Sequence, residues 1–236
     1  MINGQTNYEK YKVLRPLYSN HEYDKYGFPI IKKDKFDFND WKETRICNFK
    51  NIKSQEEKEK SIVIMFNYDN VLNNVWDNPY KYLSKFLHFK ALCTPDFTIY
   101  PGMNINDVRY NIYKNRWIGC LWQEKGYKVI PTIQWALEDT YDMCFSGVEK
   151  GSVVIISTLG CASNYEVFLK GFNKMKEVIK PSLIIVFGKM LDGMTGTFLH
   201  FEYTDSFVYK TMGYKQLRLF DVDNVFTIDR SDFYGK

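Results

Sequence analysis

Histidine is scarce in this chain of 236 residues, which contains only His21, His88 and His200. None of the three belongs to an H-x-x-x-H or HExxH pattern, and no two of the five cysteines form a C-x-x-C pair. These patterns are the usual sequence signs of zinc sites, so a metal centre of His and Cys ligands is not expected.

Long hydrophobic runs are also missing. The longest, residues 61–66 and 152–156, are far too short to span a bilayer, and the N-terminal residues lack the apolar segment of a signal peptide. We therefore expect a cytoplasmic protein without membrane contact, with its cysteines reduced. The net charge of +4 comes from scattered Lys and Arg residues, which permit an acidic partner without requiring one.

The glycine signatures of common nucleotide sites and of the nucleophile elbow are absent. The sequence has no GxxxxGK[ST], no GxGxxG and no G-x-S-x-G. A P-loop NTPase, a typical dinucleotide-binding protein and an α/β-hydrolase are therefore not indicated. The cofactor stays unknown, and the sequence leaves open whether the protein is an enzyme.

Aromatic residues, in contrast, are abundant. They make up 17% of the chain, with 18 Tyr and 18 Phe, and the hydrophobic content of 45% is enough for one sizeable core. Lys, Asn, Ile, Tyr and Phe are plentiful and Ala is scarce, as in proteins from AT-rich genomes. That codon bias explains most of the aromatic residues without giving them a stacking function.

Apolar, β-branched runs alternate with helical patterns along the middle of the chain. The expected strands are 61–69, 89–93, 128–135, 152–158 and 182–188, and the expected helices are 79–89, about 104–126 and 165–179. Continuous apolar strands separated by helices are typical of a parallel sheet with right-handed crossovers. The predicted fold class is α/β, with a mostly parallel sheet that is either open and doubly wound or irregular and (β/α)-barrel-like.

The chain is expected to form one body with less regular ends. Residues 61–188 are the predicted α/β core. Residues 1–60 are an N-terminal extension that packs on this core, and residues 189–236 are a C-terminal extension.

In both architectures ligands bind where the parallel strands end. Polar residues follow each predicted strand: Asn67, Asp69, Thr94, Asp96, Gln134, Trp135, Ser157, Thr158, Cys161 and Lys189. This edge is therefore the expected location of a site.

Asp96, Asp69 and Cys161 are the candidate catalytic residues. The two carboxylates would hold a divalent cation or share acid–base work if they converge, although both also lie in turn-like sequences. Cys161 precedes a predicted helix, whose N-terminus favours a thiolate, and a Cys–His pair would require His88 or His200.

A second group of residues is a candidate for ligand binding. On the helix after residue 104, Arg109 and Arg116 are seven residues apart and would clamp a phosphate or carboxylate, or form surface ion pairs. The turn STLGC at 157–161 offers backbone donors for an anion, or else Gly160 simply provides a positive φ. The full predicted set is Asp96, Arg109, Asn111, Arg116, Trp135, Ser157, Thr158 and Gly160.

Several separated motifs resemble one family. The segment TPDFTIYPGMNINDVRYNIYKNRWIGCLWQEKGYKVIPTIQW, then MCFSGVEKGSVVIISTLGC, then KPSLIIVFG, is similar in order and spacing to the family known as domain of unknown function 4417. The resemblance covers about residues 61–188, with Phe187 where Tyr is common. It implies a protein of phages, prophages or plasmids of low-GC Gram-positive bacteria, and it carries over no activity and no catalytic residue.

Three functions are compatible with these observations. The first is an accessory protein of a mobile element that binds a phosphate-bearing ligand, a nucleotide or nucleic acid, at the strand ends. The second is an inhibitor of a host defence system that binds a host or phage protein through its terminal extensions. The third is a metal-dependent hydrolase or transferase that uses Asp69 and Asp96.

Overall fold

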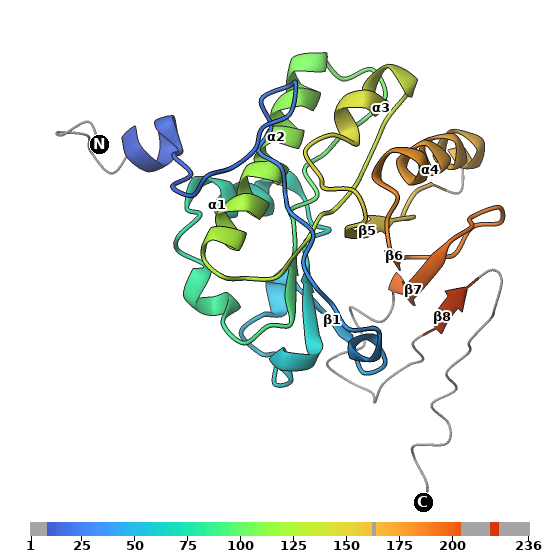
Figure 1. Cartoon of the computed structure of the whole chain (residues 1–236), viewed down its shortest axis with the longest axis horizontal. Coiled ribbons are helices and arrows are strands. Elements are labelled where there is room, and N and C mark those ends of the chain that lie inside the picture. Colours follow the sequence, from blue (N-terminus) through green and yellow to red (C-terminus); the bar gives the residue numbers. More distant parts are fainter. Residues whose placement is uncertain (1–8, 162–163, 204–217, 222–236) are drawn as a thin grey trace, which may run out of the picture.

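The structure, a computed structural model, describes residues 9–161, 164–203 and 218–221 (Figure 1). Its strands are β1 Arg45–Asn48, β2 Ser61–Ile64, β3 Ala91–Cys93, β4 Val129–Ile130, β5 Val153–Ser157, β6 Leu183–Phe187, β7 Thr197–Phe201 and β8 Arg218–Asp221. Its α-helices are α1 Asp69–Asp77, α2 Ile105–Glu124, α3 Glu138–Cys144 and α4 Tyr165–Ile179. Shorter helical turns are η1 Glu9–Leu14, η2 Phe38–Trp41, η3 Phe49–Asn51, η4 Lys58–Lys60 and η5 Leu83–Phe86.

Strands β1 to β7 run parallel and lie side by side in the order of the sequence. Two four-stranded sheets, β1-β2-β3-β4 and β5-β6-β7-β8, are joined where Thr132 and Ile155 form a parallel bridge just after β4. Strand β8 is antiparallel to β7. The α/β class and the mostly parallel sheet are confirmed, and the described strands do not close into a barrel because β1 pairs only with β2.

The sheet is curled, so that its inner face packs on itself. One cluster of buried side chains contains residues from β1 to β7 and no residue of α1 to α4. Within it Phe66, just after β2, stacks on Phe187 at the end of β6, with ring centroids 5.2 Å apart. Contact between strands so far apart in the sheet order requires the sheet to bend, as in a partial barrel.

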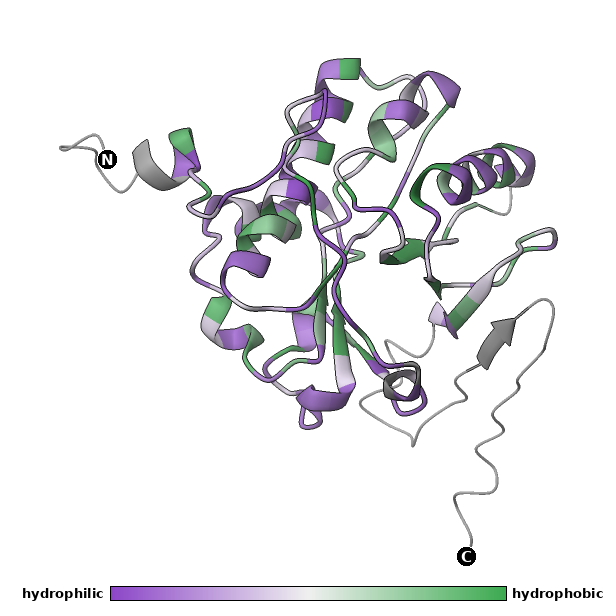
Figure 2. Ribbon diagram, in the orientation of Figure 1, coloured by the Kyte–Doolittle hydropathy of each residue, from purple (hydrophilic) through white to green (hydrophobic). Residues whose placement is uncertain are grey.

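The other face of the sheet carries the helices. Two clusters join the outward strand residues to the helices, one with α1 and α2 and one with α2, α3 and α4. In Figure 1 the four helices follow one another around one side of the strands, and Figure 2 shows hydrophobic residues concentrated on the strands. Because each helix returns the chain from the end of one strand to the start of the next, all four begin at the carboxyl edge of the sheet.

Several expected elements differ from those observed. The helix expected at 79–89 is observed only as the short turn η5. Helix α1, which was not expected, ends at Asp77 because Pro79 disfavours helical geometry at the preceding Asn78, which has φ −135° and ψ 61°. Strands β1 and β7 extend the sheet beyond residues 61–188. Of the expected C-terminal extension, residues 204–217 and 222–236 lie outside the described residues.

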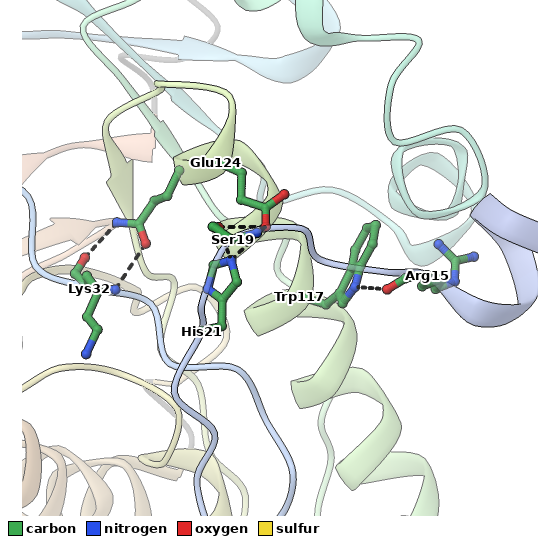
Figure 3. Close-up of polar contacts among 7 residues, drawn as sticks. Arg15, Ser19, His21, Lys32, Trp117 and Glu124 are labelled. Atoms are coloured by element: carbon green, nitrogen blue, oxygen red, sulfur yellow. Dashed lines mark hydrogen bonds and ion pairs between the residues drawn. The ribbon is translucent and has the colours of Figure 1, made fainter. Parts of the chain in front are cut away.

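The N-terminal residues 15–34 form a strap along α2 (Figure 3). Trp117 Nε1 donates to Arg15 O at 2.8 Å, and the Arg15 guanidinium lies 3.4 Å from the ring centre of Trp76. Farther along α2, Glu124 accepts hydrogen bonds from the backbone N–H and the hydroxyl of Ser19, both at 2.7 Å. The strap packs on the side of α2 through specific polar contacts. Within the described ranges, no helix is long and apolar enough to cross a membrane.

Candidate site at the carboxyl edge of the sheet

Asp96 lies on the loop that leads from β3 toward α2. Its backbone N–H donates to Met65 O at 3.3 Å, just beyond β2, so the loop crosses the carboxyl ends of two neighbouring strands. Pro95 precedes it and Phe97, which is fully buried, follows it. The loop is therefore anchored by its apolar neighbours, while Asp96 itself is half-buried at the sheet edge.

Side chains from α2 hold the backbone of this loop. Asn111 Nδ2 donates to Thr98 O at 2.6 Å, and Asn115 Nδ2, one helical turn later, donates to Pro95 O at 2.8 Å. Residues four apart share one helix face, which explains how two asparagines reach the same loop. Asn111 was predicted to contact a ligand, and the structure instead uses it to position the loop that carries Asp96.

Neighbouring strands and α1 hold the loop from the other sides. Gln134, after β4, donates to Phe97 O, and Thr132 donates from its backbone N–H and its hydroxyl to the hydroxyl and the carbonyl oxygen of Thr94. Asp69, the first residue of α1, accepts from both the N–H and the hydroxyl of Thr98, at 3.0 and 2.9 Å. Each of these contacts removes conformational freedom from the loop, so the position of Asp96 is fixed in advance of any ligand.

The carboxyl group of Asp96 has an unusual proton affinity. Burial, and then the nearby negative charge of Asp69, raises the pKa of Asp96 from 3.8 to about 7. The structure thus brings together the two predicted acids, Asp69 and Asp96, at one edge. Near neutral pH, Asp96 is poised between a form that donates a hydrogen bond and a form that only accepts.

Two further polar groups lie close to this pair: Lys114, which the sequence reasoning missed, and Asn67, which was expected at this edge. Lys114 on α2 is buried, with its ammonium 3.8 Å from the ring centre of Phe97; burial lowers its pKa, and the charge of Asp69 opposes that change. Asn67, between β2 and α1, has a buried Nδ2 without a hydrogen-bond partner in the described part of the chain. An unsatisfied buried donor of this kind costs about 1–3 kcal/mol and is satisfied by a water or a ligand.

Cys161 lies near Asp96, and its surroundings disfavour the thiolate form. Burial raises the pKa of Cys161, and the charge of Asp96 raises it further. Its sulfur contacts the backbone oxygens of Ser157 and Leu159, at 3.9 and 3.7 Å, and not a histidine. These surroundings give no support to the expectation of a nucleophilic thiolate, because a thiol surrounded by protein and near a carboxylate holds its proton more tightly.

The turn at 157–161 uses its backbone donors internally. The N–H of Thr158 donates to Phe187 O, that of Leu159 to Ser157 Oγ and that of Cys161 to Thr158 O, at 3.1, 3.2 and 3.1 Å. Gly160 has φ 75°, which explains the glycine by backbone geometry. These contacts leave no support for the predicted anion site at this turn.

Arg109 and Arg116 do not form a clamp. Arg116 is 2% exposed, and its guanidinium donates to Ser146 O at 2.9 Å, to Cys144 O at 2.7 Å and to Asn115 Oδ1 at 2.6 Å. Arg109 is exposed, with its guanidinium 5.8 Å from the ring centre of Tyr26. The buried arginine fixes the segment after α3 to α2, so only Arg109 is free to approach a phosphate.

Trp135 is largely engaged in packing. Its ring contacts Phe145 and Phe168, with centroids 5.9 and 5.2 Å away, and a Cβ added to Gly171 of α4 would lie 2.1 Å from its Nε1. The indole thus fills the space between α3 and α4. Among the residues that the structure describes, no group of three or more His, Cys, Asp or Glu side chains is arranged to hold a metal ion.

These features define an α/β protein with one curled, mostly parallel sheet and a half-buried acid of raised pKa at its carboxyl edge. The chain belongs to the family described as domain of unknown function (DUF4417), whose model matches residues 24–204, a longer stretch than the motifs at 61–188 covered. The resemblance predicted from those motifs is confirmed. The match includes β1 and β7, in agreement with their place in the sheet.

Two curated relatives come from bacteriophages. The chain is 36% identical to the Gene 1 protein of Mycobacterium phage L5 over 118 residues, and this match covers 49% of the present chain and 52% of the phage protein. It is 34% identical over 119 residues to the Gene 1 protein of Mycobacterium phage D29, covering 49% and 44%. The chain thus spans about half the length of the curated relatives it matches. No solved structure matches the chain.

Proposed function

We propose that the carboxyl edge around Asp96 is a binding site at which Asp96 exchanges a proton or a hydrogen bond with a polar group of the ligand. The supporting observation is a carboxyl group with a pKa of about 7 on a loop held by α1, α2 and β4. Keeping an acid in surroundings that oppose its ionisation destabilises the fold at neutral pH. Proteins accept such strain mainly at functional sites.

Asp69 and Asn67 extend this site. Asp69 is fixed by Thr98 and contributes negative charge beside Asp96, and the unsatisfied Nδ2 of Asn67 offers a hydrogen-bond donor. A pair of carboxyl groups with different environments is a common basis for acid–base work, in which one group holds the proton. A protonated Asp96 beside Asp69 is such an arrangement.

The phosphate-bearing ligand expected from the sequence is supported less well. Two of its supports, Arg116 and the donors of residues 157–161, are used within the protein. The alternative of a metal-dependent hydrolase keeps the proximity of Asp69 and Asp96 as its support. We therefore propose a polar ligand recognised at Asp96, and include phosphates and divalent cations in its test.

A thermal-shift screen at pH 6 and pH 8 tests the proposal. Nucleosides, nucleotides, sugars, amino acids and divalent cations are each added to the wild-type protein, to Asp96→Asn and to Asp107→Asn, an exposed aspartate on α2. A ligand at a hundredfold excess over Kd stabilises the native state by about 2.7 kcal/mol. We expect a stabilising ligand whose effect differs between the two pH values, is lost in Asp96→Asn and persists in Asp107→Asn.

Equal stabilisation of Asp96→Asn and the wild-type protein by that ligand would contradict the proposal. A shift with nucleotides but not with the matching nucleosides would restore the phosphate hypothesis. A shift with a divalent cation alone that requires both Asp69 and Asp96 would favour the metal-dependent alternative.

A further inference from the structure

Three segments that pack beside α1 and α2 contain lysines and no acidic residue. They are residues 48–55, 78–89 and 125–127, which include η3, η5 and the residues just after α2. Lys85 is half-buried and the other lysines of these segments are exposed. The group is called the lysine surface, and its members are Lys50, Lys53, Lys81, Lys85 and Lys125.

Aromatic contacts join the three segments. The ring of Phe49 in η3 lies 5.2 Å from that of Tyr82 and 6.2 Å from that of Phe86 in η5, measured between centroids. The hydroxyl of Tyr127, after α2, donates to Leu83 O at 2.5 Å. These contacts place η3, η5 and the end of α2 next to one another, so their lysines share one part of the molecular surface.

Tyrosine rings hold several of the ammonium groups. The Nζ atoms of Lys81 and Lys85 lie 5.9 and 4.8 Å from the centre of the Tyr82 ring, and Nζ of Lys125 lies 5.9 Å from that of Tyr80. A ring attracts a cation without neutralising its charge. Three positive charges are therefore positioned by the fold, and none of them forms an ion pair with another residue of the described ranges.

The acids that border the lysine surface do not interrupt it. Asp77, at the end of α1, lies near the guanidinium of Arg15, and Glu124 lies 2.9 Å from His21 Nε2. The adjoining segment 56–60 has the sequence EEKEK, and so borders the surface with charges of both signs. The lysines of η3, η5 and the end of α2 thus stay together without an acid among them.

We propose that the lysine surface binds the phosphate backbone of a single-stranded nucleic acid. Like charges held together repel one another, and an anion that lies across them removes this repulsion. Lysine is a compact point charge suited to phosphate, whereas the planar fork of arginine matches a carboxylate as well. The half-buried rings of Tyr82 and Tyr127 lie beside the lysines, and proteins that bind single strands combine basic and aromatic groups in this way.

Fluorescence anisotropy of a labelled single-stranded thymidine oligonucleotide with the full chain tests the proposal. If each of the five lysines neutralises one phosphate, the logarithm of the affinity should fall with the logarithm of the salt concentration with a slope of about −3.5. A glutamate peptide of the same net charge is the comparison probe. We expect it to bind at least about tenfold more weakly than the oligonucleotide.

A matched pair of double variants locates the binding. Lys81→Gln with Lys85→Gln removes two charges from the lysine surface, and Lys150→Gln with Lys189→Gln removes two exposed charges elsewhere. We expect the first pair to weaken oligonucleotide binding by about tenfold or more at low salt and to make the salt slope shallower by about 1.4. The second pair has the same net charge and should weaken binding by less than about twofold.

A further double variant, Lys50→Gln with Lys125→Gln, tests whether η3 and the end of α2 belong to the same surface. It should weaken binding as much as the changes in the segment of η5 do. Both side chains are exposed, so the protein is expected to fold, and urea unfolding checks this.

Three results would overturn the inference. They are no binding of the oligonucleotide, equal loss in the lysine-surface and control variants, and equally tight binding of the glutamate peptide. The inference does not rest on the site proposed around Asp96. Asp96→Asn should retain oligonucleotide binding, so failure of the lysine surface and failure of the Asp96 site give different results.

Discussion

Replacing Asp96 by asparagine is expected to stabilise the protein at pH 8. In the folded protein the pKa of Asp96 is raised from 3.8 to about 7, so the folded state binds this proton more tightly than the unfolded state does. The group therefore favours the native state fully only below about pH 4. This favourable contribution is lost as the pH rises from about 4 to about 7.

The size of the effect follows from the same shift. A change of the pKa from 3.8 to about 7 corresponds to about 4 kcal/mol of free energy of unfolding, lost once the pH exceeds 7. Asparagine keeps the shape of the side chain and carries no charge. Asp96→Asn should therefore exceed the wild-type protein in stability at pH 8 by up to about 4 kcal/mol, and should gain little at pH 4.

Urea unfolding of the wild-type protein and Asp96→Asn across pH 4 to 8 measures this difference. Asp107→Asn is the control, because that aspartate is exposed on the surface of α2. An Asp96→Asn protein that is less stable than the wild type at pH 8, or a stability difference that does not change with pH, would contradict the raised pKa of Asp96.

Three further predictions test the structural roles assigned above. Arg116→Met should lower the free energy of unfolding in a urea titration by about 3–5 kcal/mol, because it leaves buried carbonyl oxygens unpaired. The control, Arg109→Met, should change it by less than about 0.5 kcal/mol. Gly171→Ala should lower it by about 1–3 kcal/mol and alter tryptophan fluorescence, since the new methyl group would displace the indole of Trp135; unchanged fluorescence would contradict this. Cys161 should react with iodoacetamide at pH 7.5 more slowly than the cysteine of an unstructured peptide, because its pKa is raised. Mass spectrometry measures the rate, and an equal or faster reaction of Cys161 would show an activated thiolate.

Much of the fold could be predicted from the pattern of apolar residues. The runs at β5 and β6 and the helical spacing of α2 and α4 are long enough to be distinctive, and Asn104 caps α2 by accepting from the N–H of Asn106 at 2.9 Å. The edge strands were harder to predict. Strand β1 has four residues and a mixed burial pattern, so only its pairing with β2 reveals it.

The candidate site was predictable by position and less so by role. Because parallel strands end at one edge, Asp69 and Asp96 could each be assigned to that edge from the sequence, whereas their proximity depends on tertiary packing. It could not show that Arg116 is buried, because an arginine on an amphipathic helix is usually exposed and its partners lie about 30 residues away in the chain. The spacing of Asn111 and Asn115 was a usable signal for a shared face, although their common target, the loop of Asp96, depends on tertiary packing.

Titration of the Asp96 side chain by carbon-13 NMR tests the central claim most directly. The carboxyl signal is identified by its absence in Asp96→Asn and is followed from pH 3 to pH 9. A midpoint near 7, shifted downward in Asp69→Asn, is the predicted result, because burial and the charge of Asp69 both raise the pKa of Asp96. A midpoint near 4 would show an ordinary surface carboxylate and contradict the account of this edge as a proton-exchanging site.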